Sequence, residues 1–186
     1  MRAVYLDKDG TLVENLSYNI DPGKAKMLPG VEEGLQALHR AGYQLVVVSN
    51  QSGVARGLFS EADLIPIWKW LRGQFERCGV PLLDIFYCPH LPESNNPAYA
   101  RDCACRKPNP GMLNEAARAY GIDLPRSWMI GDILDDVEAG HRAGCRSVLL
   151  DTGNETEWKP GVYRMPEYTA GSFMEAADYC LEHSQG

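Results

Sequence analysis

The sequence has no long hydrophobic run. Four apolar residues, 3–6, precede the first charge of the core at Asp7, which is too short for the apolar segment of a signal peptide. No stretch approaches the roughly 18 apolar residues that cross a bilayer. We therefore expect a cytoplasmic protein that has no membrane partner.

Positive charge is also scarce. The chain has 18 Lys and Arg against 25 Asp and Glu, which gives a formal net charge of −7. A surface that binds nucleic acid needs clustered cations to displace counterions, so we expect no nucleic-acid partner. An acidic protein can still bind a small anion through local cations, a metal and backbone N–H groups.

A disulfide framework is not expected, although the chain has six cysteines. Three of them lie with a histidine between positions 88 and 105, and Cys78, Cys145 and Cys180 are scattered. Without an export signal, the clustered group is typical of metal ligands and the others of buried thiols. The 186 residues, 45% of them hydrophobic, suit a single domain spanning 1–186.

Short apolar runs alternate with amphipathic stretches along the chain. Their continuous hydrophobicity predicts parallel strands that are covered on both faces, at 3–6, 44–48, 84–87, 128–130 and 147–150. Helical spacing predicts helices at 31–41, 60–75, 110–120, 135–143 and 172–182. Pro66 either kinks the second helix or moves its start. Strand and helix alternation predicts an α/β three-layer sandwich with a central parallel sheet and no large cap.

Carboxylates follow the predicted strands at one edge of this sheet, where ligands of parallel sheets bind. Asp7 and Asp9 come after the first strand and Asp132 after the fourth, while Ser49 follows the second. Gly10 lets the chain bend so that both aspartates reach one ligand. Because neighbouring carboxylates repel, we expect a bridging Mg²⁺, with Asp132 as a further ligand. An Asp-Gly pair can also be a simple turn, but the other motifs disfavour that interpretation.

These motifs together resemble those of the haloacid dehalogenase superfamily. The resemblance rests on residues 7–11, Ser49, Lys107 and 131–136, and it covers nearly the whole chain. It implies that Asp7 is a nucleophile that forms an aspartyl-phosphate. It further implies the following roles: Asp9 as general acid and base that also offers its backbone carbonyl to the metal, Ser49 and Lys107 as ligands of the phosphoryl oxygens, Asp132 as a magnesium ligand, and Asp136 as a supporting group.

The long polar loop 89–108 needs something to order it. Cys88, His90, Cys103 and Cys105 supply three sulfurs and one imidazole, the tetrahedral donor set of a structural zinc site. The alternative is that the cysteines and the histidine fall together by chance. A zinc ion would fix the loop just before Lys107 and its neighbouring arginine.

Phosphatases of this superfamily with such a zinc loop include two groups, which act on D-glycero-D-manno-heptose-1,7-bisphosphate and on histidinol phosphate. The fourteen residues between Cys88 and Cys103, and the segment 108–112, resemble the heptose group more closely. That resemblance implies a phosphorylated sugar substrate, with contacts at Asn15, Leu16, Ser17, Tyr18, Asn50, Gln51, Ser52 and Arg106. Many relatives have Lys where this chain has Ile133, which leaves the preferred sugar or anomer open.

Other function classes stay in view. A phosphoryl mutase would normally shield its intermediate with a larger cap, and Asp9 favours hydrolysis. A non-catalytic zinc module is disfavoured because the whole catalytic set is present. A nucleic-acid 3′-phosphatase shares the motifs but disagrees with the acidic composition. We expect a monomer.

Overall fold

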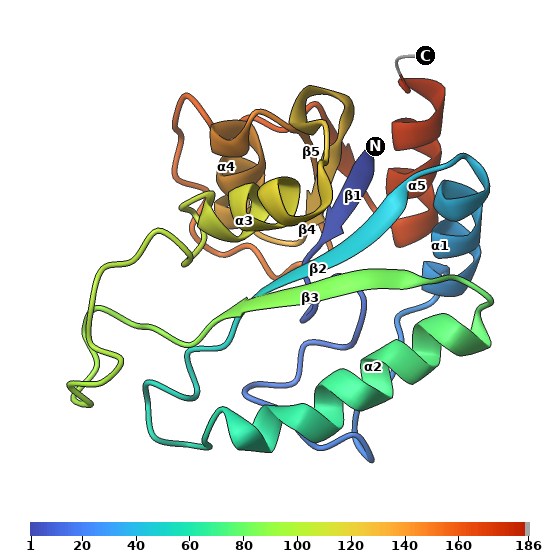
Figure 1. The fold of residues 1–186 in the computed structure, drawn as a ribbon. Coiled ribbons are helices and arrows are strands. Elements are labelled where there is room, and N and C mark those ends of the chain that lie inside the picture. Colours follow the sequence, from blue (N-terminus) through green and yellow to red (C-terminus); the bar gives the residue numbers. More distant parts are fainter. Residues whose placement is uncertain (185–186) are drawn as a thin grey trace.

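The computed structural model describes residues 1–184 (Figure 1). Six strands are present: β1 Ala3–Leu6, β2 Gln44–Asn50, β3 Leu82–Cys88, β4 Trp128–Gly131, β5 Arg146–Leu150 and β6 Tyr168–Ala170. Five α-helices accompany them: α1 Val31–Arg40, α2 Ile65–Arg77, α3 Gly111–Tyr120, α4 Leu134–Ala143 and α5 Phe173–Glu182. Two 3₁₀ turns lie at Ala62–Leu64 and Leu124–Arg126.

The strands form one sheet in the order β3-β2-β1-β4-β5-β6, and every neighbouring pair is parallel. The predicted parallel α/β architecture is therefore confirmed, with β1 at the centre. The edge strand β6 was not predicted. It has only three residues, and its Tyr-Thr-Ala sequence has an exposed threonine between its two neighbours, so it lacks the continuous apolar run of a central strand.

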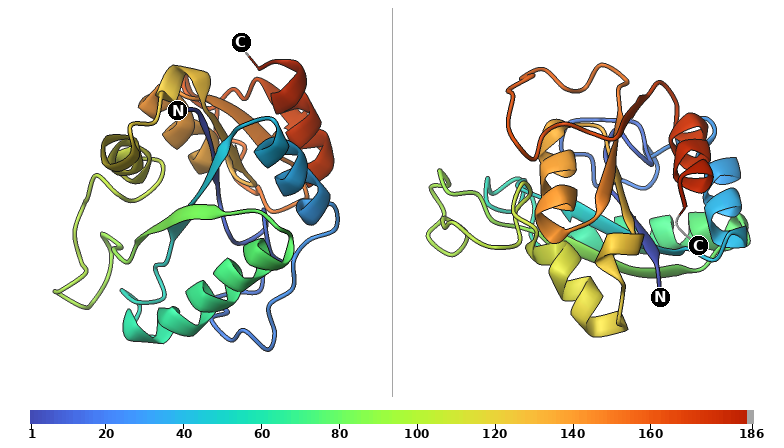
Figure 2. Two further views of the ribbon diagram at one scale, coloured as in Figure 1. Left: turned by 45° about the vertical axis from the view of Figure 1, so that its right-hand side comes forward. Right: turned by 90° about the horizontal axis from the view of Figure 1, so that it is seen from above.

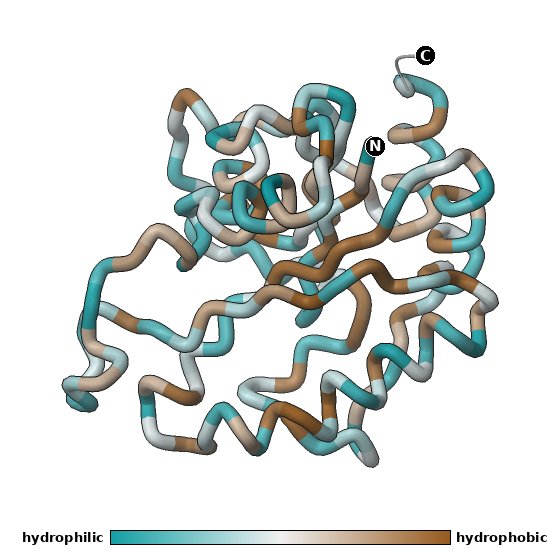
Figure 3. The backbone as a smooth tube through the Cα atoms, viewed as in Figure 1, coloured by the Kyte–Doolittle hydropathy of each residue, from teal (hydrophilic) through white to brown (hydrophobic). Residues whose placement is uncertain are grey.

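Helices cover both faces of the sheet and complete three layers (Figure 2). Val4 and Leu6 of β1 pack in the core with α1, α2 and α5, whereas Ala3 and Tyr5 pack with α3 and α4. Successive strand residues point to opposite faces, so both sets must be apolar. The tube in Figure 3 is accordingly brown along much of β2 and β3.

The start of α2 answers the question that Pro66 raised. The helix begins at Ile65, and the proline occupies its first turn, where the missing N–H has no intrahelical partner to lose. Ahead of it, the 3₁₀ turn Ala62–Leu64 is closed by Asp63, whose carboxylate accepts hydrogen bonds at 2.7 Å from both the backbone N and the hydroxyl of Ser60. The proline therefore moves the helix start and does not kink the helix.

Long connections gather at the carboxyl end of the sheet. One runs from β1 to α1 and another from β3 to α3, and neither contains a helix or a strand of the sheet (Figure 1). This is the edge at which the carboxylates were predicted. Within residues 1–184, no helix is both long enough and apolar enough to span a bilayer.

Candidate active site

The loop after β1 is a tight turn that brings Asp7 and Asp9 to the sheet edge. The backbone N–H of Asp7 still donates to Ile130 at 3.0 Å, which extends the β1–β4 ladder by one residue. Gly10 then has a φ of +87°, and a Cβ at this position would lie 2.0 Å from the Oδ2 atom of Asp132. Glycine is required here both by the backbone conformation and by the close approach of this carboxylate.

Three carboxylates meet at this turn. Oxygens of Asp7, Asp132 and Asp136 all lie within 4.8 Å of one another, and the three residues are buried. Burial, together with the charges of Asp7 and Asp136, raises the pKa of Asp132 to about 8. Burial and the charge of Asp7 likewise raise the pKa of Asp136 to about 6, although Lys107 acts against this. Buried, mutually repelling oxygen ligands fit a hard divalent cation such as Mg²⁺.

Lys107 is the cation of this cluster. Its Nζ atom donates to Asp7 Oδ1 at 2.6 Å and to the carbonyl of Val48 at 2.9 Å, and it lies 2.6 Å from Asp136 Oδ1. Burial lowers the pKa of the amine, but the charges of Asp136 and Asp7 outweigh that effect and raise it overall. Lys107 is therefore held charged beside the predicted nucleophile.

Asp9 has a different set of neighbours. Its carboxylate pairs with the buried amine of Lys8, and it accepts a long hydrogen bond of 3.4 Å from Gln51 Nε2. Burial raises its pKa, the charge of Asp7 adds to this, and Lys8 and Gln51 oppose it. A carboxyl group with a raised pKa keeps its proton to higher pH, as a general acid must.

The end of β2 supplies two kinds of contact. The hydroxyl of the buried Ser49 accepts a hydrogen bond from Gln51 Nε2 at 2.9 Å. The Asn50 amide instead bonds twice to the backbone of Lys107, since its Nδ2 donates to the carbonyl at 3.1 Å and its Oδ1 accepts from the N–H at 3.1 Å. Asn50, which was predicted to bind substrate, thus holds the backbone of Lys107 in place.

A cavity of about 230 Å³ opens in front of Asp9. It brings together seven of the eight predicted substrate contacts along with Asp9, in a lining formed by Asp9, Asn15, Leu16, Ser17, Tyr18, Asn19, Asn50, Gln51, Ser52 and Gly53. The eighth, Arg106, lines an adjacent cavity of about 270 Å³ together with Lys107, and its Nη1 donates to the carbonyl of His90 at 3.3 Å. The assigned roles of these residues in substrate binding stay predictions.

The loop after β3 brings the four predicted metal ligands together. Sulfur atoms of Cys88, Cys103 and Cys105 lie 3.1–3.5 Å apart, and Nδ1 of His90 lies 3.6 Å from Cys88 Sγ and 3.3 Å from Cys105 Sγ. The hydrogen bond between Cys105 and Cys88 lowers the pKa of Cys105 to about 5, although burial opposes it, so the cluster readily holds a thiolate. Three sulfurs and an imidazole at one point fit a closed tetrahedral zinc site.

Lys8 and Asn154 lie at this site but were not predicted there. Lys8 is 2% exposed and pairs with Asp9, a placement that its position between two aspartates could have suggested. Asp136, which the resemblance implied as a supporting group, lies in the carboxylate cluster and contacts Lys107 directly. Asn154 lies close to Gly10, and its Oδ1 accepts from Asn15 at 3.3 Å. No local sequence signal places Asn154 at the site, because Gly10 and Asn15 lie about 140 positions away from it.

Known proteins resemble this chain in sequence and in structure. A family model described as HAD-hydrolase-like matches residues 104–176. The chain is 41% identical over 152 residues to the D-glycero-beta-D-manno-heptose-1,7-bisphosphate 7-phosphatase of Photorhabdus laumondii, covering 81% of each protein. It is 36% identical over 157 residues to the corresponding alpha enzyme of that organism, covering 84% of this chain and 86% of that enzyme.

The fold matches that of the D,D-heptose 1,7-bisphosphate phosphatase from B. bronchiseptica, which was crystallised with magnesium and phosphate. The TM-score is 0.80 at 33% identity, and the match covers 98% of this chain and 99% of the other. The motifs, the site geometry and these relatives agree. The chain belongs to the haloacid dehalogenase superfamily of phosphatases, in the family that contains the heptose-1,7-bisphosphate 7-phosphatases.

Proposed function

We propose that this phosphatase is magnesium-dependent, acts through an aspartyl-phosphate on Asp7, and removes the 7-phosphate of D-glycero-D-manno-heptose-1,7-bisphosphate. The observation that carries the proposal is the position of Asp7. The Asp7 carboxylate lies at the carboxyl edge of the sheet, 2.6 Å from the buried amine of Lys107, with the buried Asp132 and Asp136 beside it.

In the first step, a carboxylate oxygen of Asp7 attacks phosphorus, and the bond from phosphorus to the ester oxygen breaks. The departing oxygen takes the proton of Asp9, whose raised pKa keeps that proton available. Lys107 and the hydroxyl of Ser49 bind the phosphoryl oxygens as charge moves onto them.

In the second step, water hydrolyses the acyl phosphate. Asp9, now a carboxylate, takes a proton from the water, whose oxygen bonds to phosphorus while the bond to Asp7 breaks. Inorganic phosphate leaves and both aspartates return to their starting states. Lys8 keeps the carboxylate of Asp9 paired during this half of the cycle.

Two metals fit the residues present. Asp7 and Asp132, with the backbone carbonyl of Asp9, would hold Mg²⁺, and Asp136 lies beside them. When bound, the ion offsets the repulsion between a carboxylate nucleophile and a phosphate dianion. Zinc at the Cys88–Cys105 cluster would have a structural task, since the loop leads directly into Lys107.

The substrate assignment is supported by relatives of both anomer specificities and by the polar lining of the cavity in front of Asp9. Ile133 stands where many relatives have lysine, so the anomer stays open. We also propose a cytoplasmic monomer that has no nucleic-acid or membrane partner.

Steady-state kinetics test the substrate. We expect kcat/KM to be higher for both anomers of heptose-1,7-bisphosphate than for histidinol phosphate, and magnesium omission to stop turnover reversibly. A preference for histidinol phosphate would contradict the heptose assignment while leaving the phosphatase chemistry intact.

A further inference from the structure

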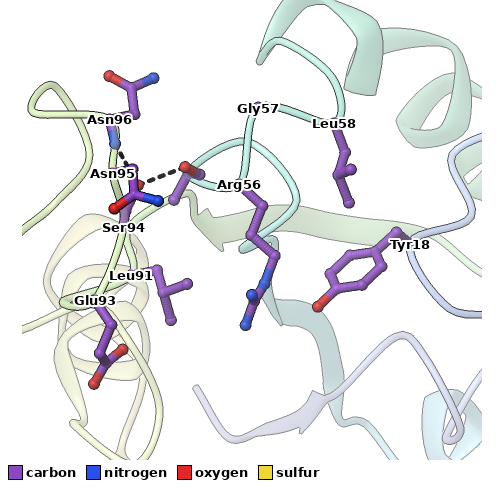
Figure 4. Close-up of a pocket in the computed structure, with 10 residues that line it drawn as sticks. Tyr18, Arg56, Gly57, Leu58, Leu91, Glu93, Ser94, Asn95 and Asn96 are labelled. Atoms are coloured by element: carbon purple, nitrogen blue, oxygen red, sulfur yellow. Dashed lines mark hydrogen bonds between the residues drawn. The ribbon is translucent and has the colours of Figure 1, made fainter.

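A larger cavity of about 650 Å³ lies next to the catalytic one (Figure 4). It shares Tyr18 with the cavity in front of Asp9, and it shares Leu91 and Glu93 with the cavity that contains Arg106 and Lys107. The three cavities therefore follow one another around the catalytic edge. A substrate that extends past Tyr18 enters the large cavity.

Arg56 projects into this space. Figure 4 shows its guanidinium between Leu91 and Tyr18, with the Tyr18 hydroxyl turned to the same side. Within residues 1–184, the guanidinium makes no ion pair and no side-chain hydrogen bond, and it lies near the Tyr18 ring, whose centroid is 5.8 Å from Cζ. Unpaired arginines are common on protein surfaces, so its surroundings must decide whether this one has a task.

The backbone beneath Arg56 is fixed. Its N–H donates to the carbonyl of Ser52 at 3.0 Å, and Gly57 closes the turn onto Val54 at 3.0 Å. From the zinc loop, the Ser94 hydroxyl donates to the carbonyl of Ala55 at 2.5 Å, a contact drawn in Figure 4. The backbone that carries Arg56 is therefore held in place by both the catalytic segment 49–53 and the zinc loop.

Tyr18 provides an independent observation. It is the one non-glycine residue of 1–184 with a positive φ, 53°, a conformation that costs an L-residue roughly 1–2 kcal/mol. The residue is 49% exposed, so burial of the ring does not offset that cost. Strain without a packing gain is typical of residues that a binding site positions. Here the strain places the ring and hydroxyl against Arg56.

We propose that Arg56, supported by Tyr18, determines specificity by binding the phosphate at the end of the substrate that is not cleaved. A planar guanidinium matches phosphate oxygens in a bidentate manner, and the tyrosine hydroxyl can donate a further hydrogen bond. The carboxylate of Glu93 and the amides of Asn95 and Asn96 line the same cavity and can accept from sugar hydroxyls. This inference rests on the proposed function, since it presupposes a sugar bisphosphate.

The test compares two substrates that differ only in the second phosphate. The ratio of kcat/KM for heptose-1,7-bisphosphate to that for heptose 7-phosphate is measured in the wild type and in Arg56→Met, Arg56→Lys and Tyr18→Phe. We expect Arg56→Met to lower the ratio about tenfold to a hundredfold, because a charge-assisted contact is lost. The ratio for Arg56→Lys should lie between those of the wild type and Arg56→Met, since an ammonium keeps the charge but cannot bind in a bidentate manner.

Arg118→Met is the matched control, because it removes an exposed arginine from α3 and should leave the ratio unchanged. The proposal is overturned if the wild-type ratio is near one. It is also overturned if Arg56→Met lowers kcat/KM equally for both substrates or for neither. Should Arg56→Met fail to fold, the ratio in Arg56→Lys decides. A wild type that prefers histidinol phosphate refutes the heptose assignment separately, because the ratio compares the two sugars with each other.

Discussion

The catalytic edge and the zinc loop are built in opposite ways. At the catalytic edge, Lys107 reaches Asp7 across 100 positions of sequence, and both are buried. In the zinc loop, the contacts among the four cluster side chains span at most 17 positions, and only Cys88 of these four residues is buried. The first region needs the complete sheet to form, whereas the second brings its four side chains together within one loop.

The two regions meet at a single lysine. The zinc loop ends two residues before Lys107, and Asn50 of β2 holds the backbone of that lysine with two hydrogen bonds. The sheet places the carboxylates, and the loop delivers the cation that lies between them. We therefore expect substitutions at the catalytic edge to lower kcat most and substitutions in the zinc loop to raise KM most.

The largest effect is expected for Asp7→Asn. An amide cannot attack phosphorus, so kcat should fall at least about a thousandfold while the fold persists. Turnover and thermal unfolding should be measured together, with the exposed Asp178→Asn on α5 as the control for an acid-to-amide change. Near-normal activity in Asp7→Asn would end the nucleophile assignment.

Gly10 offers a steric test of the same edge. Gly10 and Gly42 share a φ of +87°, but a Cβ at Gly10 would lie 2.0 Å from Asp132 Oδ2, whereas a Cβ at Gly42 meets nothing within 4 Å. Alanine should cost each site about 1 kcal/mol of backbone strain. Only Gly10→Ala should also lower kcat/KM, by about a hundredfold, because it displaces the Asp132 carboxylate. Equal losses in the two variants would contradict this packing.

For the zinc loop, Cys103→Ser should act on binding more than on chemistry. Loss of one thiolate weakens zinc affinity, so metal analysis should find about one zinc per chain in the wild type and less in the variant. The looser loop should raise KM about tenfold with a smaller change in kcat. Cys78→Ser, outside the cluster, is the control. Wild-type protein purified without zinc would remove the hypothesis.

The smallest effect concerns pH in magnesium-free buffer. The folded pKa of Asp132, about 8, lies above the unfolded value of about 4, so the folded state binds this proton more tightly. Stability should therefore fall as pH rises between these values, by several degrees in the unfolding midpoint, and added Mg²⁺ should abolish the fall.

The hydrogen bond to Glu167 raises the pKa of His141, so the stability that this histidine contributes is also lost as pH rises. The Mg²⁺-sensitive part of the profile is therefore the difference between wild type and Asp132→Asn. Identical profiles in these two proteins would contradict the carboxylate cluster.

Most of the central sheet and of the catalytic edge could be predicted from the sequence. Continuous apolar runs identify β1 to β5, and the residues that follow them identify Asp7, Ser49 and Asp132, because parallel strands end at a common edge. The cluster of Cys88, His90, Cys103 and Cys105 was equally visible, since its members are rare residues close together in sequence.

Other features could not be read from local patterns. β6 is too short for a periodic signal, and the positioning role of Asn50 depends on a partner 57 positions away. The placement of Arg56 between Tyr18 and Leu91 depends on how three loops meet. Such contacts come from tertiary packing, to which the order of residue types gives no direct access.

Trapping the phosphorylated enzyme tests the central claim most directly. Asp9→Asn should slow hydrolysis of the intermediate, and p-nitrophenyl phosphate has a leaving group that needs little protonation. After rapid quenching, mass spectrometry should find one phosphoryl group on the peptide that contains Asp7. Phosphate release with no labelled peptide, or a label on another residue, would contradict Asp7 as the nucleophile.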